Sequence, residues 1–124
     1  MEKRWKVEFH DDFVPEFRAL SREVKRHFAG QIEFLEALGP LLSRPFADTL
    51  KGTKCPNMKE LRFDADGGVW RVAFIFDPER SAILLVAGDK SGTSQDRFYR
   101  SLIRIAEERY EKHLVALRTR KEDK

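Results

Sequence analysis

The segment from Asn57 to Phe76, NMKELRFDADGGVWRVAFIF, constrains the fold more than any other part of the sequence. Its centre, Asp64 to Gly68, has the composition of a tight turn, and apolar residues alternate with polar ones on both sides of it. The pattern predicts two antiparallel strands. If Arg62 lies opposite Arg71, alternation sorts the side chains into two faces, with Leu61, Phe63, Trp70, Val72, Phe74 and Phe76 on one and Glu60, Arg62, Arg71 and Ala73 on the other.

The predicted opposition of Arg62 and Arg71 needs an explanation. Like charges that face each other across strands destabilise a sheet unless a carboxylate or a bound anion compensates for them. One interpretation is that both arginines pair with Glu60 and Asp89 on an otherwise empty face of the sheet. The other is anion binding, because a planar guanidinium donates two hydrogen bonds to the oxygens of a phosphate. The residues alone leave both open.

The sequence before the hairpin predicts one strand and two helices. Residues 5–10, WKVEFH, alternate strictly and indicate a half-buried strand. Asp11-Asp12 supplies an N-cap for a short helix. Ser21 can cap a second helix, which Gly39-Pro40 ends. The two helices form a hairpin whose apolar stripes pack on the sheet, and residues 41–55 show no regular pattern.

The sequence after the hairpin predicts one strand and one helix. Residues 81–88, SAILLVAG, form a continuous apolar run, as expected of a strand with neighbours on each side. Residues 93–96, TSQD, resemble a capping box for a last helix, and residues 118–124 are expected to fray. The predicted fold class is α+β, in a single domain over residues 1–124. An N-terminal strand, a helical hairpin, a three-stranded antiparallel meander that completes a small sheet, and a C-terminal helix follow in that order.

Charge and cysteine content limit the classes of function. The chain has 24 Lys and Arg against 21 Asp and Glu, so its net charge of +3 permits a polyanionic partner without requiring one. The single cysteine, Cys55, cannot form an internal disulfide, and the sequence has no C-x-x-C pair for zinc. A reducing cytoplasm fits best. The sequence predicts neither a signal peptide nor a membrane-spanning segment.

Cations on or beside the predicted sheet are more informative than those on helix surfaces, and they are Lys51, Lys54, Lys59, Arg62, Arg71 and Lys90. Lys90 lies in a glycine-containing loop before the last helix, where free N–H groups and the helix dipole favour an anion. An ordinary connecting loop is the alternative. The His10-Asp11-Asp12 run fits helix capping better than a metal site, because a third ligand is not evident.

Six segments, taken together and in order, resemble the phage-derived, HigB-like branch of the RelE/ParE toxin superfamily: residues 48–52 (DTLKG), 57–62 (NMKELR), 70–72 (WRV), 82–86 (AILLV), 88–92 (GDKSG) and 98–99 (FY). The resemblance covers nearly the whole chain. It implies the RelE/ParE-like fold, whose element order is the one predicted above. It also implies the toxin of a type II toxin–antitoxin module.

RelE- and HigB-like toxins are ribonucleases that cut messenger RNA, commonly on the ribosome, without a metal or cofactor. The resemblance therefore implies Arg71 as transition-state stabiliser, Arg62 and Lys59 as phosphate ligands or proton movers, and Lys90 as a second phosphate contact. Lys54 and Lys51 are expected to bind substrate, and Tyr99 is expected to stack on a base or assist proton transfer. Some HigB proteins place histidines in this site, and this sequence has none at those positions. A lysine is the alternative base.

The resemblance also implies partners. An antitoxin encoded nearby, often of the helix-turn-helix type, is expected, together with messenger RNA and the ribosome. Operator DNA is expected only through the antitoxin complex, and no membrane contact is expected. Two alternatives stay open: a ParE-like toxin that inhibits gyrase, and a catalytically inactive protein that retains only antitoxin binding.

Overall fold

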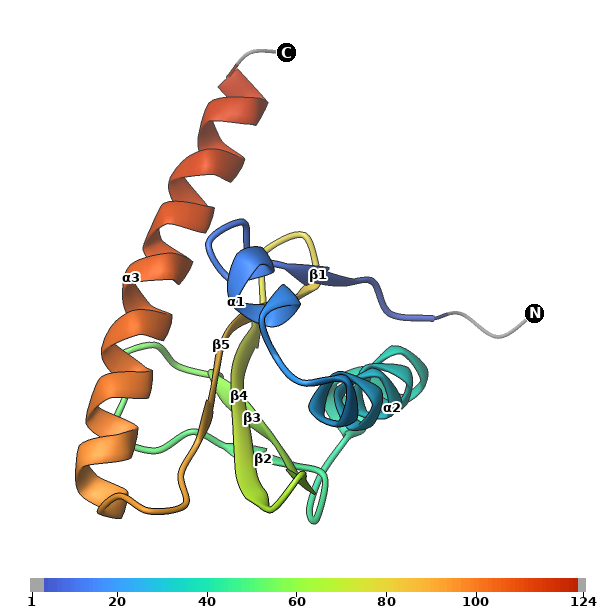
Figure 1. Ribbon diagram of the computed structural model, residues 1–124. Coiled ribbons are helices and arrows are strands. Elements are labelled where there is room, and N and C mark those ends of the chain that lie inside the picture. Colours follow the sequence, from blue (N-terminus) through green and yellow to red (C-terminus); the bar gives the residue numbers. More distant parts are fainter. Residues whose placement is uncertain (1–3, 123–124) are drawn as a thin grey trace.

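The structure, a computed structural model, describes residues 4–122 and is built around one five-stranded sheet in the order β1-β5-β4-β3-β2. Figure 1 shows how the elements are arranged. In chain order they are β1 (Val7–Phe9), α1 (Val14–Arg18), α2 (Arg22–Leu38), the 3-10 turn η1 (Gly39–Leu41), β2 (Ala47–Thr49), β3 (Lys59–Ala65), β4 (Gly68–Phe76), β5 (Ala82–Asp89) and α3 (Gln95–Glu122).

The predicted hairpin is confirmed as β3 and β4, in the predicted register. Arg62 pairs with Arg71, and Ala65 pairs with Gly68. The two residues between that last pair, Asp66 and Gly67, both have positive φ, 52° and 76°. An Asp-Gly loop with this backbone matches the twist of the flanking strands, which explains why the hairpin closes there. β5 lies antiparallel to β4, and β1 adds to its other edge in parallel. The 81–88 run therefore has two neighbours, as predicted.

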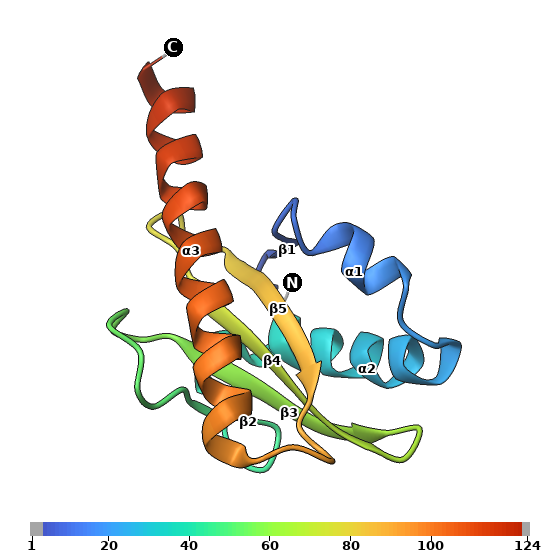
Figure 2. The ribbon, with the colours of Figure 1, turned by 60° about the vertical axis from the view of Figure 1, so that its left-hand side comes forward.

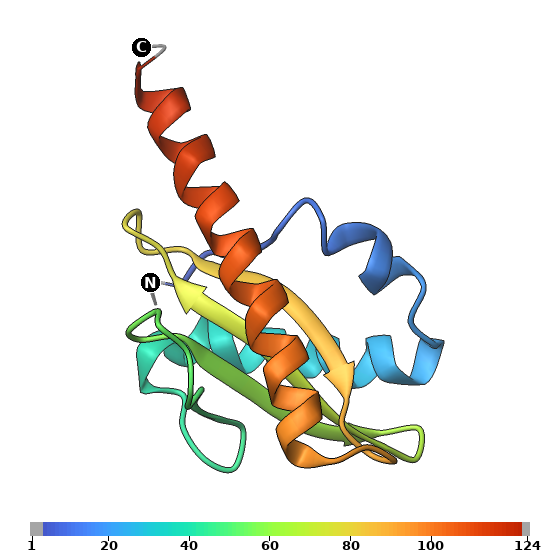
Figure 3. The ribbon, with the colours of Figure 1, turned by 90° about the vertical axis from the view of Figure 1, so that its left-hand side faces the viewer.

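Helices cover both faces of the sheet. In Figure 1 the sheet lies between α3 on the left and α1 and α2 on the right. The two sides have separate cores. Phe13, Val24, Phe28, Leu35, Leu61, Val72 and Phe74 pack together under α1 and α2. Leu50, Met58, Ile75, Ile83, Leu85, Leu102 and Ala106 pack together under α3. Figures 2 and 3 show that α3 crosses the sheet and that its C-terminal turns extend past it.

Two of the predicted helix starts are confirmed by cap geometry. The Ser21 hydroxyl accepts a hydrogen bond from Val24 N at 3.2 Å, and the Ser94 hydroxyl accepts one from Arg97 N, also at 3.2 Å. The predicted Asp11-Asp12 cap is wrong, because the residue that caps α1 is Phe13, without a side-chain bond. The Asp12 carboxylate instead accepts a hydrogen bond from the ammonium group of Lys112, 3.0 Å away.

Two boundaries also differ from the prediction. Residues 41–55 include the short edge strand β2, which pairs with β3 and brings the loop before it against the sheet. The tail predicted to fray is helical to Glu122, and residues 123–124 lie outside the described part of the chain. Arg120 and Lys121 in the last turn favour the helix, because they offset the negative end of its dipole. No helix within residues 4–122 is long and apolar enough to cross a bilayer.

Candidate active site

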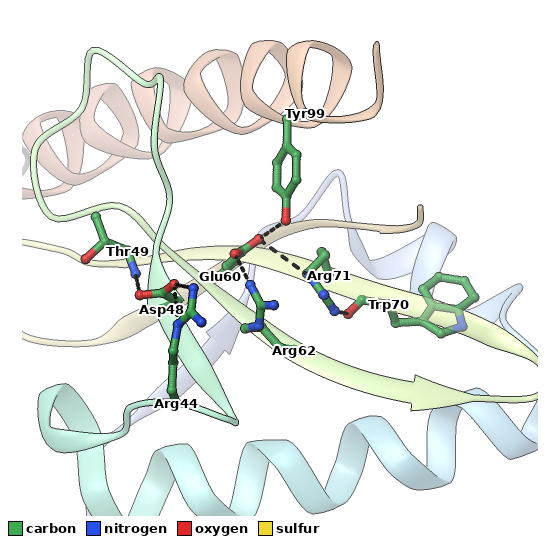
Figure 4. A network of polar contacts seen from close by, with 8 residues as sticks. All are labelled: Arg44, Asp48, Thr49, Glu60, Arg62, Trp70, Arg71 and Tyr99. Carbon is green, nitrogen blue, oxygen red and sulfur yellow. Dashed lines mark hydrogen bonds and ion pairs between the residues drawn. The ribbon is translucent and has the colours of Figure 1, made fainter. Parts of the chain in front are cut away.

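A buried carboxylate compensates for the opposed arginines. Glu60 lies two positions before Arg62 on β3, so both side chains lie on the same face. The Glu60 Oε2 atom accepts a hydrogen bond from Arg62 Nη1 at 2.8 Å, and its Oε1 atom is 3.9 Å from Arg71 Nε. Glu60 is only 4% exposed and Arg71 only 6%. Figure 4 shows the Arg62 and Arg71 side chains both directed toward Glu60.

α3 contributes the fourth member of this group. The hydroxyl of Tyr99, near the start of α3, donates a hydrogen bond to Glu60 Oε1 at 2.7 Å. Burial raises the pKa of Tyr99 above 10.0, and the Glu60 carboxylate raises it further, although the positive charge of Arg71 acts in the opposite direction. The phenol is therefore protonated at neutral pH and can act as a proton donor.

Arg71 retains an unused donor. Its Nη1 atom donates to the backbone oxygen of Trp70 at 2.9 Å, whereas its Nε atom is buried and has no hydrogen-bond partner within residues 4–122. A buried N–H without a partner costs free energy, on the order of 1–3 kcal/mol. A hydrogen-bond acceptor that reached this N–H group would remove that cost.

Both arginines reach an open cavity of about 310 Å³, whose lining residues are Arg44, Pro45, Arg62, Phe63, Asp64 and Arg71. Arg62 and Arg71 share the Glu60 carboxylate, and Asp64 also lines the cavity, so the feature that favours an anion is the pair of guanidinium forks and not a net positive charge. Of the two acidic partners considered from the sequence, Glu60 fills the role and Asp89 does not. Asp89 Oδ1 instead accepts hydrogen bonds from the backbone N–H groups of Val69 and Ser91, both at 2.9 Å.

Lys59 lies on the other face of the sheet, which corrects the predicted convergence. It pairs with Phe74, a core residue under α2, and its Nζ atom donates to the backbone oxygen of Pro40 at 3.2 Å. The physical reason is the pleat: residues an odd number of positions apart along a strand point to opposite faces. Lys59 and Arg62 are three positions apart, so their side chains point to opposite faces, and Lys59 is not among the residues that line the cavity.

The remaining predicted residues surround the arginines without lining their cavity. Lys90 N donates to Val69 O at 2.8 Å, which places Lys90 beside β4 two residues from Arg71. Lys51 is exposed in the turn after β2. Lys54 lines a different cavity, of about 900 Å³, between α3 and the loop before β3. The structure thus brings Arg62, Arg71 and Tyr99 into direct contact with Glu60, and leaves the lysines outside that contact.

Sequence reasoning missed the pair formed by Arg44 and Asp48. Asp48 on β2 lies opposite Glu60 on β3, so the two carboxylates are neighbours on one face. Asp48 Oδ2 accepts a hydrogen bond from Arg44 Nε at 2.9 Å and forms an ion pair with Arg44 Nη2, 2.7 Å away. These bonds, the backbone N–H of Thr49 and the positive charge of Arg62 keep the pKa of Asp48 below its usual 3.8, against slight burial. Arg44 and Asp48 lie beside Glu60 and Arg62 only because β2 pairs with β3. The sequence analysis did not predict β2 and therefore could not identify these two residues.

Comparison with known proteins places this chain in a family. Residues 15–111 match the family model described as phage derived protein Gp49-like. The chain is 43% identical over 100 residues to HigB3 of Mycobacterium tuberculosis, covering 81% of this chain and 85% of that protein. It is 41% identical over 97 residues to HigB2 of the same organism, covering 77% of this chain and 48% of that longer protein. Both relatives are designated toxins.

Solved structures show the same fold. A free mutant of the Escherichia coli toxin RelE superposes with a TM-score of 0.54 at 12% identity, over 81% of this chain and 94% of that one. RelE in its complex with RelB from Pyrococcus horikoshii gives a TM-score of 0.52 at 19% identity, over 75% of this chain and 100% of that one. The predicted α+β, RelE-like fold is confirmed. The chain belongs to the family of phage-derived Gp49-like proteins, and HigB toxins are among its relatives.

Proposed function

We propose that this toxin is a metal-independent endoribonuclease that cuts messenger RNA on translating ribosomes and thereby inhibits translation. The observation that carries the proposal is the convergence of two strand guanidiniums, those of Arg62 and Arg71, on one open cavity. Two guanidiniums in one cavity suit the two non-bridging oxygens of a phosphodiester. The HigB-like family of the chain supports a toxin, and the geometry supports RNA chemistry in particular.

The reaction assigned to the site is transfer of the phosphoryl group to the neighbouring 2′-hydroxyl. The 2′-oxygen attacks phosphorus and its proton passes to the Glu60 carboxylate, which lies among the arginines. The bond from phosphorus to the 5′-oxygen breaks, and Tyr99 gives that oxygen its proton. The products are a 2′,3′-cyclic phosphate and a 5′-hydroxyl. Glu60 returns the proton to Tyr99 through their 2.7 Å hydrogen bond, which restores both groups.

Arg62 and Arg71 have an electrostatic role in this reaction. Charge on the non-bridging oxygens increases as the 2′-oxygen bonds to phosphorus, and fixed guanidiniums stabilise that charge without rearranging. Arg71 is held by its bond to Trp70 O, and Arg62 by Glu60. Loss of one such donor reduces rates by about 10²- to 10³-fold in comparable oxyanion sites. Lys90, Lys51 and Lys54 would contact the RNA backbone outside the cavity. Lys59 takes no part.

The partners follow from the same proposal. A RelE relative forms a complex with RelB, so an antitoxin encoded nearby, of the helix-turn-helix type, would neutralise this toxin in the cytoplasm. The toxin would reach operator DNA only through that complex. The ribosome would supply the contacts that a 124-residue chain lacks for holding messenger RNA.

Induction of the toxin without its antitoxin tests the proposal. The unmodified chain should stop growth and produce new RNA 5′ ends in phase with codons. The variants R62A and R71A should do neither. R104A, a change at a guanidinium that is 63% exposed on α3, should act like the unmodified chain. Cleavage that persists in both R62A and R71A would overturn the assignment. Growth arrest with DNA damage and intact transcripts would favour a gyrase inhibitor, and harmless expression would favour an inactive antitoxin-binding protein.

A further inference from the structure

A third guanidinium lines the cavity, and it comes from outside the hairpin. Arg44 belongs to the loop between η1 and β2, whereas Arg62 and Arg71 belong to β3 and β4. Figure 4 shows Arg44 held beside Asp48, next to Arg62. Arg62 and Arg71 both form ion pairs with Glu60, so their countercharge does not depend on Arg44.

Two neighbouring carboxylates hold the three arginines. Asp48 lies opposite Glu60 across β2 and β3, and each binds one arginine at the cavity rim, Arg44 and Arg62 respectively. The two arrangements differ in burial. The Arg71 and Glu60 side chains are 7% and 5% exposed, whereas the Arg44 side chain is 70% exposed. The strand arginines are therefore fixed, and Arg44 is free to change partner.

The energetics of the Arg44–Asp48 pair favour such an exchange. Ion pairs between solvent-exposed side chains add little to stability, because water screens them and ordering the side chains costs entropy. Asp48 offers the Arg44 fork only one oxygen, Oδ2, because its Oδ1 accepts a hydrogen bond from Thr49 N, whereas a phosphate can offer the fork two oxygens. Replacing one acceptor with the other costs the protein little, whereas Arg71 could not move without leaving a buried charge.

The number of guanidiniums in the cavity indicates which RNA phosphate Arg44 would bind. A phosphodiester has two non-bridging oxygens, and Arg62 and Arg71 can engage both. A third guanidinium in the same cavity is then available to the next phosphate along the chain. We propose that Arg44 binds the RNA phosphate adjacent to the scissile one, and that Asp48 is the partner of Arg44 in the absence of RNA, which the phosphate displaces. The inference rests on the proposed ribonuclease function.

Salt dependence of RNA binding tests this directly. The probe is a 2′-O-methyl RNA oligonucleotide, which the proposed reaction cannot cut. The slope of log affinity against log salt falls by about 0.7 for each single-strand phosphate contact that is lost. R44A should show that reduction and bind about tenfold more weakly. R26A removes an equal charge from a site on α2, where Arg26 pairs with Glu23 and is 71% exposed, and should leave the slope unchanged.

The variant D48N separates substrate binding from a structural role. If Arg44 binds RNA, D48N frees it, and affinity should equal or exceed that of the unmodified chain. If the ion pair only braces the loop, R44A and D48N should weaken binding alike, which would overturn the proposal. A neutral methylphosphonate at the linkage next to the cleavage site should weaken binding by the unmodified chain but not weaken binding by R44A further. Additive losses would also overturn it.

The same measurements distinguish this inference from the proposed function. If R71A cuts and binds RNA as well as the unmodified chain does, the ribonuclease assignment fails. If R71A loses cleavage while R44A keeps the full salt slope, only the role of Arg44 fails. Single-turnover cleavage at saturating RNA should be nearly unchanged in R44A, because Arg44 acts in binding and not at the reacting atoms.

Discussion

Arg62 and Arg71 are directly opposite each other across β3 and β4, so two guanidiniums project from adjacent strands on the same face of the sheet. Such a pair repels, and in most sheets one member would be replaced. Here the buried Glu60 carboxylate pairs with both arginines, which also line the cavity together with Asp64. The fold therefore holds two guanidinium forks beside one cavity, where a single anion could contact both.

The variant E60Q should reduce the free energy of unfolding by about 3 kcal/mol, because it leaves Arg71 buried without a countercharge. Urea denaturation at neutral pH measures this. E33Q, at an exposed position on α2 away from the arginines, is the control and should change stability by less than about 0.5 kcal/mol. Equal stability of E60Q and the unmodified chain would mean that Glu60 does not compensate for the arginines.

The variant K59A should keep full RNA cleavage, in contrast to R62A on the same strand. Lys59 points to the α2 side of the sheet, where its only polar contact in the described chain is with the backbone oxygen of Pro40. Cleavage assays on the two purified variants, with circular dichroism to confirm folding, make the comparison. A large loss of cleavage in K59A would show that the two faces of β3 are functionally linked and that our site is incomplete.

The elements that the sequence predicted correctly are those with strong local signals. The Asp-Gly turn and the alternation beside it determined the β3–β4 register, and Ser21 and Ser94 determined where α2 and α3 begin. β2 has no comparable signal. It has only three residues, Ala47–Thr49, and becomes a strand through its pairing with β3. Tertiary context of that kind does not appear in a local pattern.

The candidate site was predicted in part for the same reason. Arg62 and Arg71 were singled out by the hairpin pattern and received their roles, together with Tyr99, from the resemblance; their grouping depends on the confirmed hairpin register. Lys59 was included because it belongs to the same four-residue motif as Arg62, although alternation sends it to the other face. Arg44 was missed because its position depends on β2 and on the Asp48 carboxylate.

The variant E107Q should make the protein less sensitive to acid. Glu107 Oε2 accepts hydrogen bonds from the hydroxyl of Thr53 at 2.7 Å and from Lys54 N at 2.8 Å, which ties the loop before β3 to α3. The Thr53 hydroxyl is the main cause that holds the pKa of Glu107 below 4.5, against partial burial. A lowered carboxyl pKa stabilises the fold above pH 4.5, and this contribution is lost as the pH falls through the folded-state pKa.

Urea denaturation from neutral pH down to about pH 3 would reveal this contribution. E107Q should be less stable than the unmodified chain at neutral pH, and the difference should shrink as the pH falls. E108Q is the matched control, because Glu108 is the next residue on α3, is 65% exposed and lies 3.7 Å from Arg104. If both variants follow the same pH dependence as the unmodified chain, the Glu107 contact does not anchor the loop.

The variant Y99F should reduce the loss of stability at alkaline pH. Burial and the Glu60 carboxylate raise the pKa of Tyr99 above 10.0, so folding favours the protonated phenol. The resulting stabilisation is fully present below pH 10, and it is lost as the pH rises through the folded-state pKa. Phenylalanine cannot ionise, and Y99F should therefore lose less stability than the unmodified chain between pH 9 and about pH 11, as measured by urea denaturation. Burial also raises the pKa of Tyr110, but Tyr110 is present in both proteins and affects them equally. If Y99F loses stability as steeply as the unmodified chain does, ionisation of Tyr99 does not cause the alkaline loss of stability.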